Sequence, residues 1–226
     1  MIVVSGMPRS GSSLMMQTLK HLGVPLIGEN DYAFEGNSYL HSQEVPAEDQ
    51  ERIASHNPWG YYEIPFEDHI DYILNKHPGK AMKILGPILI TLIPIKNIER
   101  VILCERGDKD AQATSFEKLA KLDIEVMEKE IEAGRMDPLS MRAKSIEVYR
   151  TMNLEDYKRL IDFGHRSIQR WWQDHDIKFK TWFFEDMLET CGSSIYYSST
   201  EFSIREIQRF LGLQGPIDKT IENVRK

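Results

Sequence analysis

The chain opens on a short, continuous apolar run and then changes to the spacing of a helix. Met1 to Val4 is rich in β-branched residues, which is typical of a buried parallel strand. After a glycine-rich stretch, apolar and small side chains recur on one helical face, at Leu14, Met15, Thr18, Leu19 and Leu22. Gly23 and Pro25 then mark a helix end. We therefore expect a strand, a glycine-rich turn and a helix at the start of the chain.

Three further stretches have the pattern of strands. Ala81 to Pro94 predicts a short strand, a Gly-Pro break and an apolar segment. Val101 to Cys104 predicts a second buried strand, and Lys178 to Phe184 alternates polar and apolar residues as a strand does. The segment 28–60 has no clear periodicity and predicts a long loop, which in a compact chain is usually functional or mobile.

Helical patterns separate these strands. We expect charged or amphipathic helices over 110–135 and 162–174, and a last helix that begins at a capping box made by Ser203 and Glu206. Strands that alternate with helices indicate an α/β fold with a parallel sheet. We see no repeat and no convincing linker, so we expect residues 1–226 to form a single domain.

Composition narrows the class of protein. The net charge of -7 argues against a nucleic-acid or membrane-surface protein, because both usually carry a basic excess. The two cysteines form no metal-ligand cluster, so we expect no metal. No stretch approaches about 20 apolar residues, and the first apolar run is too short for a signal peptide. We expect a soluble, cytoplasmic protein.

The glycine-rich stretch GMPRSGSS, from Gly6 to Ser13, has the features of an anion site. A turn between a strand and a helix aims several backbone N–H groups at one point, and the helix N-terminus adds partial positive charge. Gly6 and Gly11 allow close approach, and Arg9 adds a forked cation. The standard nucleotide loop reads GxxxxGK[ST], but Ser12 stands at the lysine position here. We therefore expect an anion shorter than a triphosphate.

This loop resembles the 5′-phosphosulfate loop of the PAPS-dependent sulfotransferases, where PAPS is 3′-phosphoadenosine 5′-phosphosulfate. That family carries Lys or Arg, then Ser, Gly and two hydroxyl residues, and the matching residues are Arg9, Ser10, Gly11, Ser12 and Ser13. The resemblance, to a bacterial-type branch, implies a three-layer α/β P-loop fold with a central parallel sheet flanked by helices. It also implies that these residues bind PAPS, with PAP as the desulfated product and no metal.

A second match follows the strand Val101 to Cys104. The family has an arginine after this strand and a hydroxyl residue eight positions later, and both bind the 3′-phosphate. The corresponding residues are Arg106 and Thr114, with Ser115 as an adjacent alternative. An arginine at a strand end and a hydroxyl on the next helix are able to converge on one phosphate.

A third match lies in TWFFEDMLE, from Thr181 to Glu189, which is similar to the family's YEDM segment. The resemblance implies that Phe184 packs near the adenine of PAPS. Ordinary core packing is at least as good an interpretation of this side chain.

The catalytic residues match the family only in part. Lys83 corresponds to the lysine of the family's KTHLP segment, but Leu85 replaces the histidine that acts as general base. We expect Arg9 and Lys83 to stabilise the leaving phosphate. Glu63, at the end of NPWGYYE, is our first candidate for the base, since several branches use a glutamate, and His56 is the second.

Other polar residues have weaker assignments. Asp31 and Glu35 lie in the long loop and are candidates for contacts with the acceptor. The terminal RKG segment of the family is not intact, and Arg225 either replaces it or belongs to a frayed tail.

These features predict a sulfotransferase that moves a sulfuryl group from PAPS to a hydroxyl or amine of a small-molecule or saccharide acceptor. Two alternatives remain. A P-loop small-molecule kinase would bind ATP and magnesium, but the loop lysine is missing. A non-catalytic PAP- or PAPS-binding protein is credible because the histidine base is missing. The acceptor's identity and the oligomeric state are left open.

Overall fold

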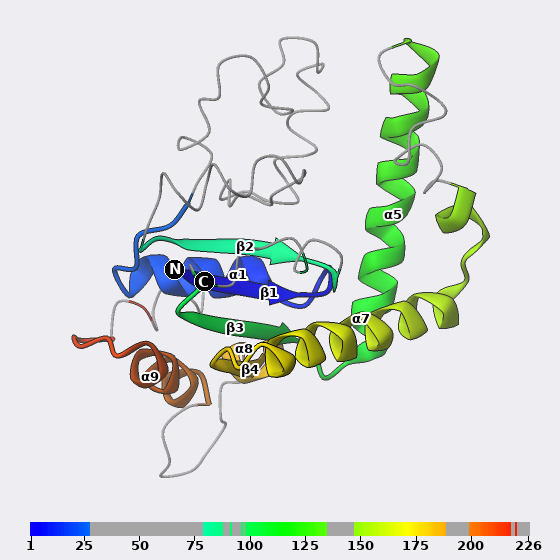
Figure 1. Cartoon of the computed structure of the whole chain (residues 1–226). Helices are drawn as coiled ribbons and strands as arrows, with labels where there is room; N and C mark the ends of the chain where they lie inside the picture. The colour runs from blue at the N-terminus through cyan, green and yellow to red at the C-terminus, as the bar shows by residue number, and fades with distance from the viewer. Residues whose placement is uncertain are drawn as a thin grey trace.

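The computed structural model describes residues 1–27, 79–87, 91, 96, 98–134, 147–188, 199–217 and 220. Its strands and helices are interspersed along the chain (Figure 1). The strands are β1 (Ile2–Gly6), β2 (Ala81–Leu85), β3 (Arg100–Glu105) and β4 (Phe179–Phe183). The helices are α1 (Ser12–His21), α5 (Lys109–Glu132), α7 (Leu154–Asp174), α8 (Phe184–Leu188) and α9 (Ser199–Leu211).

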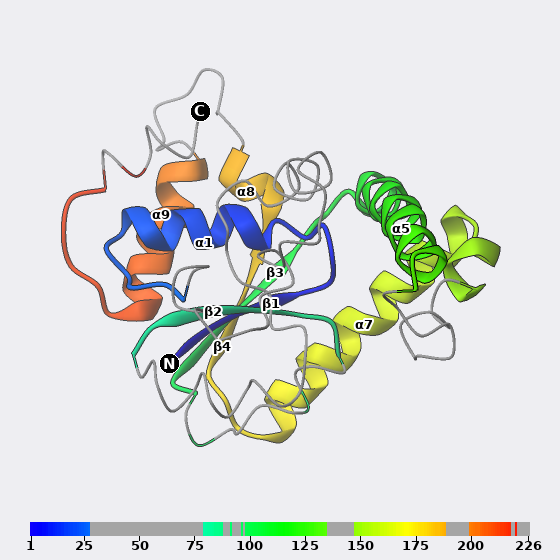
Figure 2. The same cartoon turned by 90° about the horizontal axis from the view of Figure 1, so that it is seen from above.

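The four strands form one sheet in the order β2-β1-β3-β4, and every pair is parallel. The expectation of an α/β fold with a parallel sheet flanked by helices is therefore confirmed. Helices lie on both faces of the sheet: α1 and α9 are on one side and α7 is on the other (Figure 2). This arrangement is compatible with three layers.

Strands β1, β2 and β3 are buried on both faces, which explains their mainly apolar runs, whereas the edge strand β4 is only partly buried and contains both polar and apolar residues. Val3, Met82 and Leu103 belong to the core cluster that includes residues of α5 and α7. Their chain neighbours Val4 and Cys104 belong to the other cluster, with residues of α1 and α9. The alternation follows from the two-residue period of a strand, and it brings the buried Lys83 to the same face as α1.

Two helices begin earlier than expected. Helix α7 starts at Leu154, where Asn153 and Asp156 form a capping box that was not predicted. The predicted capping box at Ser203 was wrong, because α9 already begins at Ser199. Ser203 instead donates a hydrogen bond to the Asp186 carbonyl (3.2 Å).

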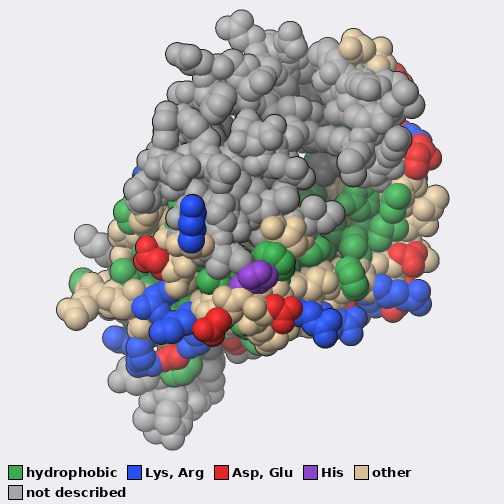
Figure 3. Space-filling model, viewed as in Figure 1, with side chains coloured by type: hydrophobic (Ala, Val, Ile, Leu, Met, Phe, Trp, Pro, Cys, Tyr) green, Lys and Arg blue, Asp and Glu red, His purple; other side chains and the backbone are tan. Residues whose placement is uncertain are grey.

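The face shown in Figure 3 carries charge of both signs. Lys and Arg side chains are interspersed with Asp and Glu along its lower edge, among the described residues. None of the described helices is both long enough and apolar enough to cross a membrane.

Candidate anion-binding site

All four strands end at one edge of the sheet. Gly6 is in register with Leu85 of β2 and Cys104 of β3, and Cys104 is in register with Trp182 of β4. The segments that follow these strands therefore meet at the carboxyl edge, where ligands bind in open parallel sheets. The residues expected to bind phosphate or sulfate follow β1, β3 and β4, so the topology gathers them at this edge.

The loop from Met7 to Gly11 joins β1 to α1, and its backbone is tightly constrained. A β-carbon on Gly6 would lie 2.5 Å from the Cys104 carbonyl oxygen and 2.6 Å from Ser10 Oγ, so only glycine fits. Arg9 has a φ of 64°, in the left-handed region that non-glycine residues rarely adopt. Such strain is concentrated at functional sites in proteins.

The N-terminus of α1 has unused hydrogen-bonding capacity. Its N-cap is Gly11, so no side chain caps the first N–H groups, and no acidic residue stands in the first turn. Ser10 is fully buried, and its Oγ has no hydrogen-bond partner in the described chain. A buried hydroxyl without a partner is costly unless a ligand satisfies it. These groups fit an anion with several acceptor oxygens.

Two cations flank this helix N-terminus. Lys83 is 1% exposed, and its Nζ lies 3.2 Å from Ser13 Oγ in the first turn of α1. Arg9 is exposed, and its Nε donates a hydrogen bond to Ser115 Oγ on α5 (2.7 Å). The positive charge that the loop lacks at position 12 is therefore supplied by the neighbouring strand β2 and by the loop's own arginine.

Phe184 links the loop to the turn after β3. A β-carbon on Gly11 would lie 2.6 Å from Cδ2 of Phe184, so the ring packs directly on the N-cap of α1. The guanidinium carbon of Arg106 lies 4.9 Å from the centroid of the same ring, a cation–π distance. The structure thus brings Gly11, Phe184 and Arg106 together.

The first turns of α5 contact the loop through Gln112 and Ser115. Gln112 donates a hydrogen bond to the Pro8 carbonyl (3.0 Å), and Ser115 accepts from Arg9. Thr114 is half-buried and lies about 100° round the helix from Ser115. Gln112 carried no sequence signal for this contact, because the contact joins residues far apart in the chain.

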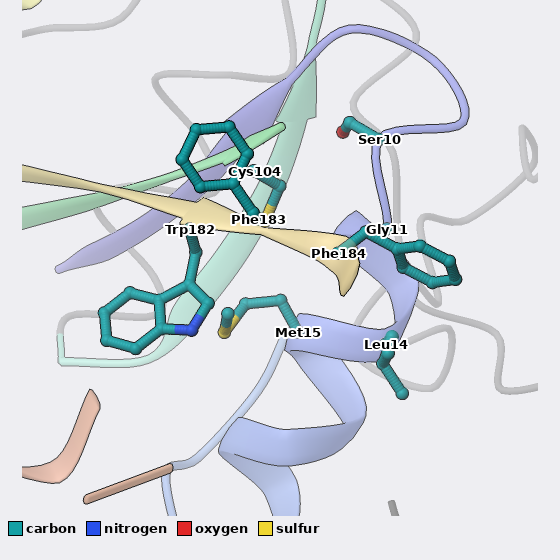
Figure 4. A pocket seen from close by; sticks show the side chains of 8 residues that line it. All are labelled: Ser10, Gly11, Leu14, Met15, Cys104, Trp182, Phe183 and Phe184. Atoms are coloured by element: carbon teal, nitrogen blue, oxygen red, sulfur yellow. The ribbon is translucent and has the colours of Figure 1, made fainter. Parts of the chain in front are cut away.

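A small apolar cavity lies under the loop. It is lined by Ser10, Gly11, Leu14, Met15, Cys104, Trp182, Phe183 and Phe184 (Figure 4), and its volume of about 10 Å³ holds one water molecule at most. Burial raises the pKa of the Cys104 thiol to about 12, with the charge of Lys83 opposing this. The cavity is too small for a ligand, and the thiol that lines it stays protonated.

A polar cluster lies behind the loop, between β3 and α7. Gln169 donates to Glu105 Oε1 (3.1 Å), and burial raises the pKa of Glu105. His165 is buried without a hydrogen-bond partner on either ring nitrogen, within the part of the chain that the structure describes. Burial, assisted by the charge of Lys109, lowers the pKa of His165 to about 3. His165 is therefore neutral near neutral pH and contributes no charge to this cluster.

Several predicted residues lie outside the described ranges. These are the candidate bases Glu63 and His56, together with Asp31, Glu35 and Arg225, and the long loop over 28–60. In the described ranges, no group of three or more His, Cys, Asp or Glu side chains is placed to hold a metal ion.

Comparison with known proteins gave no significant match to a family model, to a curated protein or to a solved structure. The functional interpretation therefore depends on the chemistry of the site.

Proposed function

We propose that this protein is a sulfotransferase that uses PAPS as sulfuryl donor and a small-molecule or saccharide hydroxyl or amine as acceptor. The position of Phe184 between Gly11 and Arg106 carries this proposal. The Phe184 ring lies between two groups suited to anions. One is the uncapped N-terminus of α1, and the other is Arg106 in the turn after β3. PAPS carries two anionic groups on one nucleoside, and a ligand of that kind fits such a pair.

The loop from Met7 to Gly11 is, in this proposal, a P-loop adapted to a phosphosulfate. Its amides and hydroxyls, with Ser10, Ser12 and Ser13, bind the 5′-phosphosulfate. Arg9 and Lys83 stabilise the negative charge that develops on the leaving phosphate oxygen. Arg106 and Thr114 bind the 3′-phosphate. Bound PAPS would supply the sulfuryl group, and Glu63 would accept the acceptor's proton.

Direct titration tests the donor. We expect calorimetry to show tight binding of PAP and much weaker binding of ATP–magnesium. Arg106→Ala should weaken PAP binding by about tenfold or more, since a charge-assisted phosphate contact is lost. Arg205→Ala is the matched control, because Arg205 forms a surface ion pair with Glu201 on α9. A preference for ATP–magnesium would replace this proposal with a kinase.

Catalysis needs a separate test. With an acceptor identified by screening with PAPS, Glu63→Gln should abolish sulfation while leaving PAP affinity unchanged. If wild-type protein binds PAP and sulfates no acceptor, the chain is a PAP- or PAPS-binding protein rather than an enzyme.

A further inference from the structure

Glu185 contacts the turn after β3 at the carboxyl edge of the sheet. It directly follows Phe184 at the start of α8, and its carboxylate accepts hydrogen bonds from two backbone groups of the turn after β3. These donors are Gly107 N (2.8 Å to Oε2) and Asp108 N (3.2 Å to Oε1). Asp108 in turn caps α5, accepting from Ala111 N (2.8 Å). One carboxylate therefore fastens this turn to the end of β4.

The same carboxylate lies beside Arg106. Oε1 of Glu185 is 3.7 Å from Arg106 Nε, an ion pair longer than a hydrogen bond. Arg106 Nε is buried and has no hydrogen-bond partner in the described residues. Phe184 supports the guanidinium from its ring face. Arg106 is thus constrained on two sides by consecutive residues, and neither contact uses its terminal amino groups in a hydrogen bond.

We infer that Glu185 is a positioning residue that holds Arg106 for recognition of the 3′-phosphate, and so sets the preference for a 3′-phosphorylated nucleotide. This inference rests on the proposed function. A carboxylate near a phosphate site repels the ligand, so Glu185 is useful there only through the geometry it imposes.

The charge state of Glu185 agrees with this role. Burial pushes its pKa upward, but the N–H groups of Gly107 and Asp108 and the charge of Arg106 outweigh burial. The pKa of Glu185 is consequently lowered, and the group is ionised at neutral pH. An ionised carboxylate accepts one backbone hydrogen bond on each oxygen, whereas an amide at this position has only one acceptor oxygen because its nitrogen is a donor.

The test compares PAP with AMP, which lacks the 3′-phosphate, by calorimetry. We expect wild-type protein to prefer PAP by about tenfold or more. Glu185→Ala should reduce this preference toward that of Arg106→Ala while changing AMP affinity by no more than about twofold. The preference of the Glu185→Gln protein for PAP over AMP should lie between those of Glu185→Ala and the wild type. The double variant Glu185→Ala, Arg106→Ala should have a preference for PAP no lower than that of Arg106→Ala alone, because Glu185 acts through Arg106.

Controls separate positioning from folding and from repulsion. Glu117→Ala removes a half-buried carboxylate that pairs with Lys121 on α5, and it should leave the preference for PAP over AMP unchanged. Melting temperatures identify variants that fail to fold, and Glu185→Gln retains the shape of the side chain. Tighter PAP binding in either Glu185 variant would show simple repulsion and overturn the inference while the proposed function stands. If wild-type protein does not prefer PAP over AMP, the proposed function fails and the inference fails with it.

Discussion

The ring of Phe184 lies so close to Gly11 that a β-carbon on the glycine would stand 2.6 Å from Cδ2. Gly11 is also the N-cap of α1, with φ 90°. The start of the helix that faces the proposed phosphosulfate therefore depends on the absence of a side chain at position 11.

Gly11→Ala should destabilise the protein and weaken PAP binding. The left-handed conformation costs alanine about 1 kcal/mol, and the overlap with Phe184 adds about 1–3 kcal/mol. Gly23→Ala is the matched control, because Gly23 has φ 80° and nothing within 4 Å of an added β-carbon. Urea denaturation measures the loss of stability in each of the two variants, and calorimetry measures PAP affinity. Equal losses in the two variants would show that Phe184 does not restrict position 11.

Two hydroxyl variants on α5 should differ in which ligand they affect. Ser115→Ala releases Arg9, whose proposed ligand is the 5′-group, so affinity for both PAP and AMP should fall by a few-fold, about 1 kcal/mol. Thr114→Val should weaken PAP alone, since Thr114 is proposed to contact the 3′-phosphate. Calorimetry with both nucleotides distinguishes these patterns. A Thr114→Val protein that binds PAP normally would remove Thr114 from the site.

His165 should make the protein less stable in mild acid. Its pKa is lowered from the ordinary 6.5 to about 3 in the folded chain, so the unfolded chain binds a proton that the folded chain excludes. The stability that depends on neutral His165 is fully present above pH 6.5. The free energy of unfolding then falls as pH drops toward about 3, with a limiting slope of about 1.4 kcal/mol per pH unit.

Urea denaturation at about pH 7, 6 and 5 checks this slope, because carboxylates with ordinary pKa values remain largely ionised over that range. Glu105, whose pKa is raised by burial, is present in both the wild type and the His165 variant and so cancels in their comparison. His165→Gln removes the titrating group, and its stability should vary less with pH than that of the wild type. Parallel pH profiles would contradict the assignment.

Cys104 should be unreactive toward thiol reagents in the native protein. Its pKa of about 12 leaves almost no thiolate near neutral pH, and its side chain is 2% exposed. Cys191→Ser leaves Cys104 as the only thiol for reaction with a coloured disulfide reagent. We expect no reaction until denaturant is added. Rapid labelling of the native variant would mean that the packing beneath the loop opens.

The sheet was predictable because parallel strands buried on both faces need continuous apolar runs. Val101 to Cys104 is such a run, and β3 extends it by one residue at each end. The starts of α7 and α9 were missed for a local reason. Asn153 is the N-cap of α7 and was not predicted as one. Ser203 and Glu206 have the spacing of a capping box, although both lie inside α9.

The sequence pointed to a candidate site only where one segment carries the chemistry. The loop from Gly6 to Ser13 is contiguous, so its residue types pointed to an anion. The contact between Arg9 and Ser115, and those of Glu185 with Gly107 and Asp108, join segments that meet only when the sheet has formed. Glu185 was inside a recognised segment, but no local pattern distinguished a role for it.

The order of the strands also governs when this site comes into existence. The central strand β1 pairs Ile2 with Ala81 on one side and with Arg100 on the other, so each partner closes a long stretch of chain. Sheets built from such non-local pairs fold slowly. The groups proposed to surround the anion lie within or directly after β1, β2, β3 and β4, so partly folded chains that lack any of these pairings lack the complete site. A nucleotide that binds there would stabilise only the completed fold, because partly folded chains have no complete site to bind it. It would therefore raise the free energy of unfolding without stabilising folding intermediates.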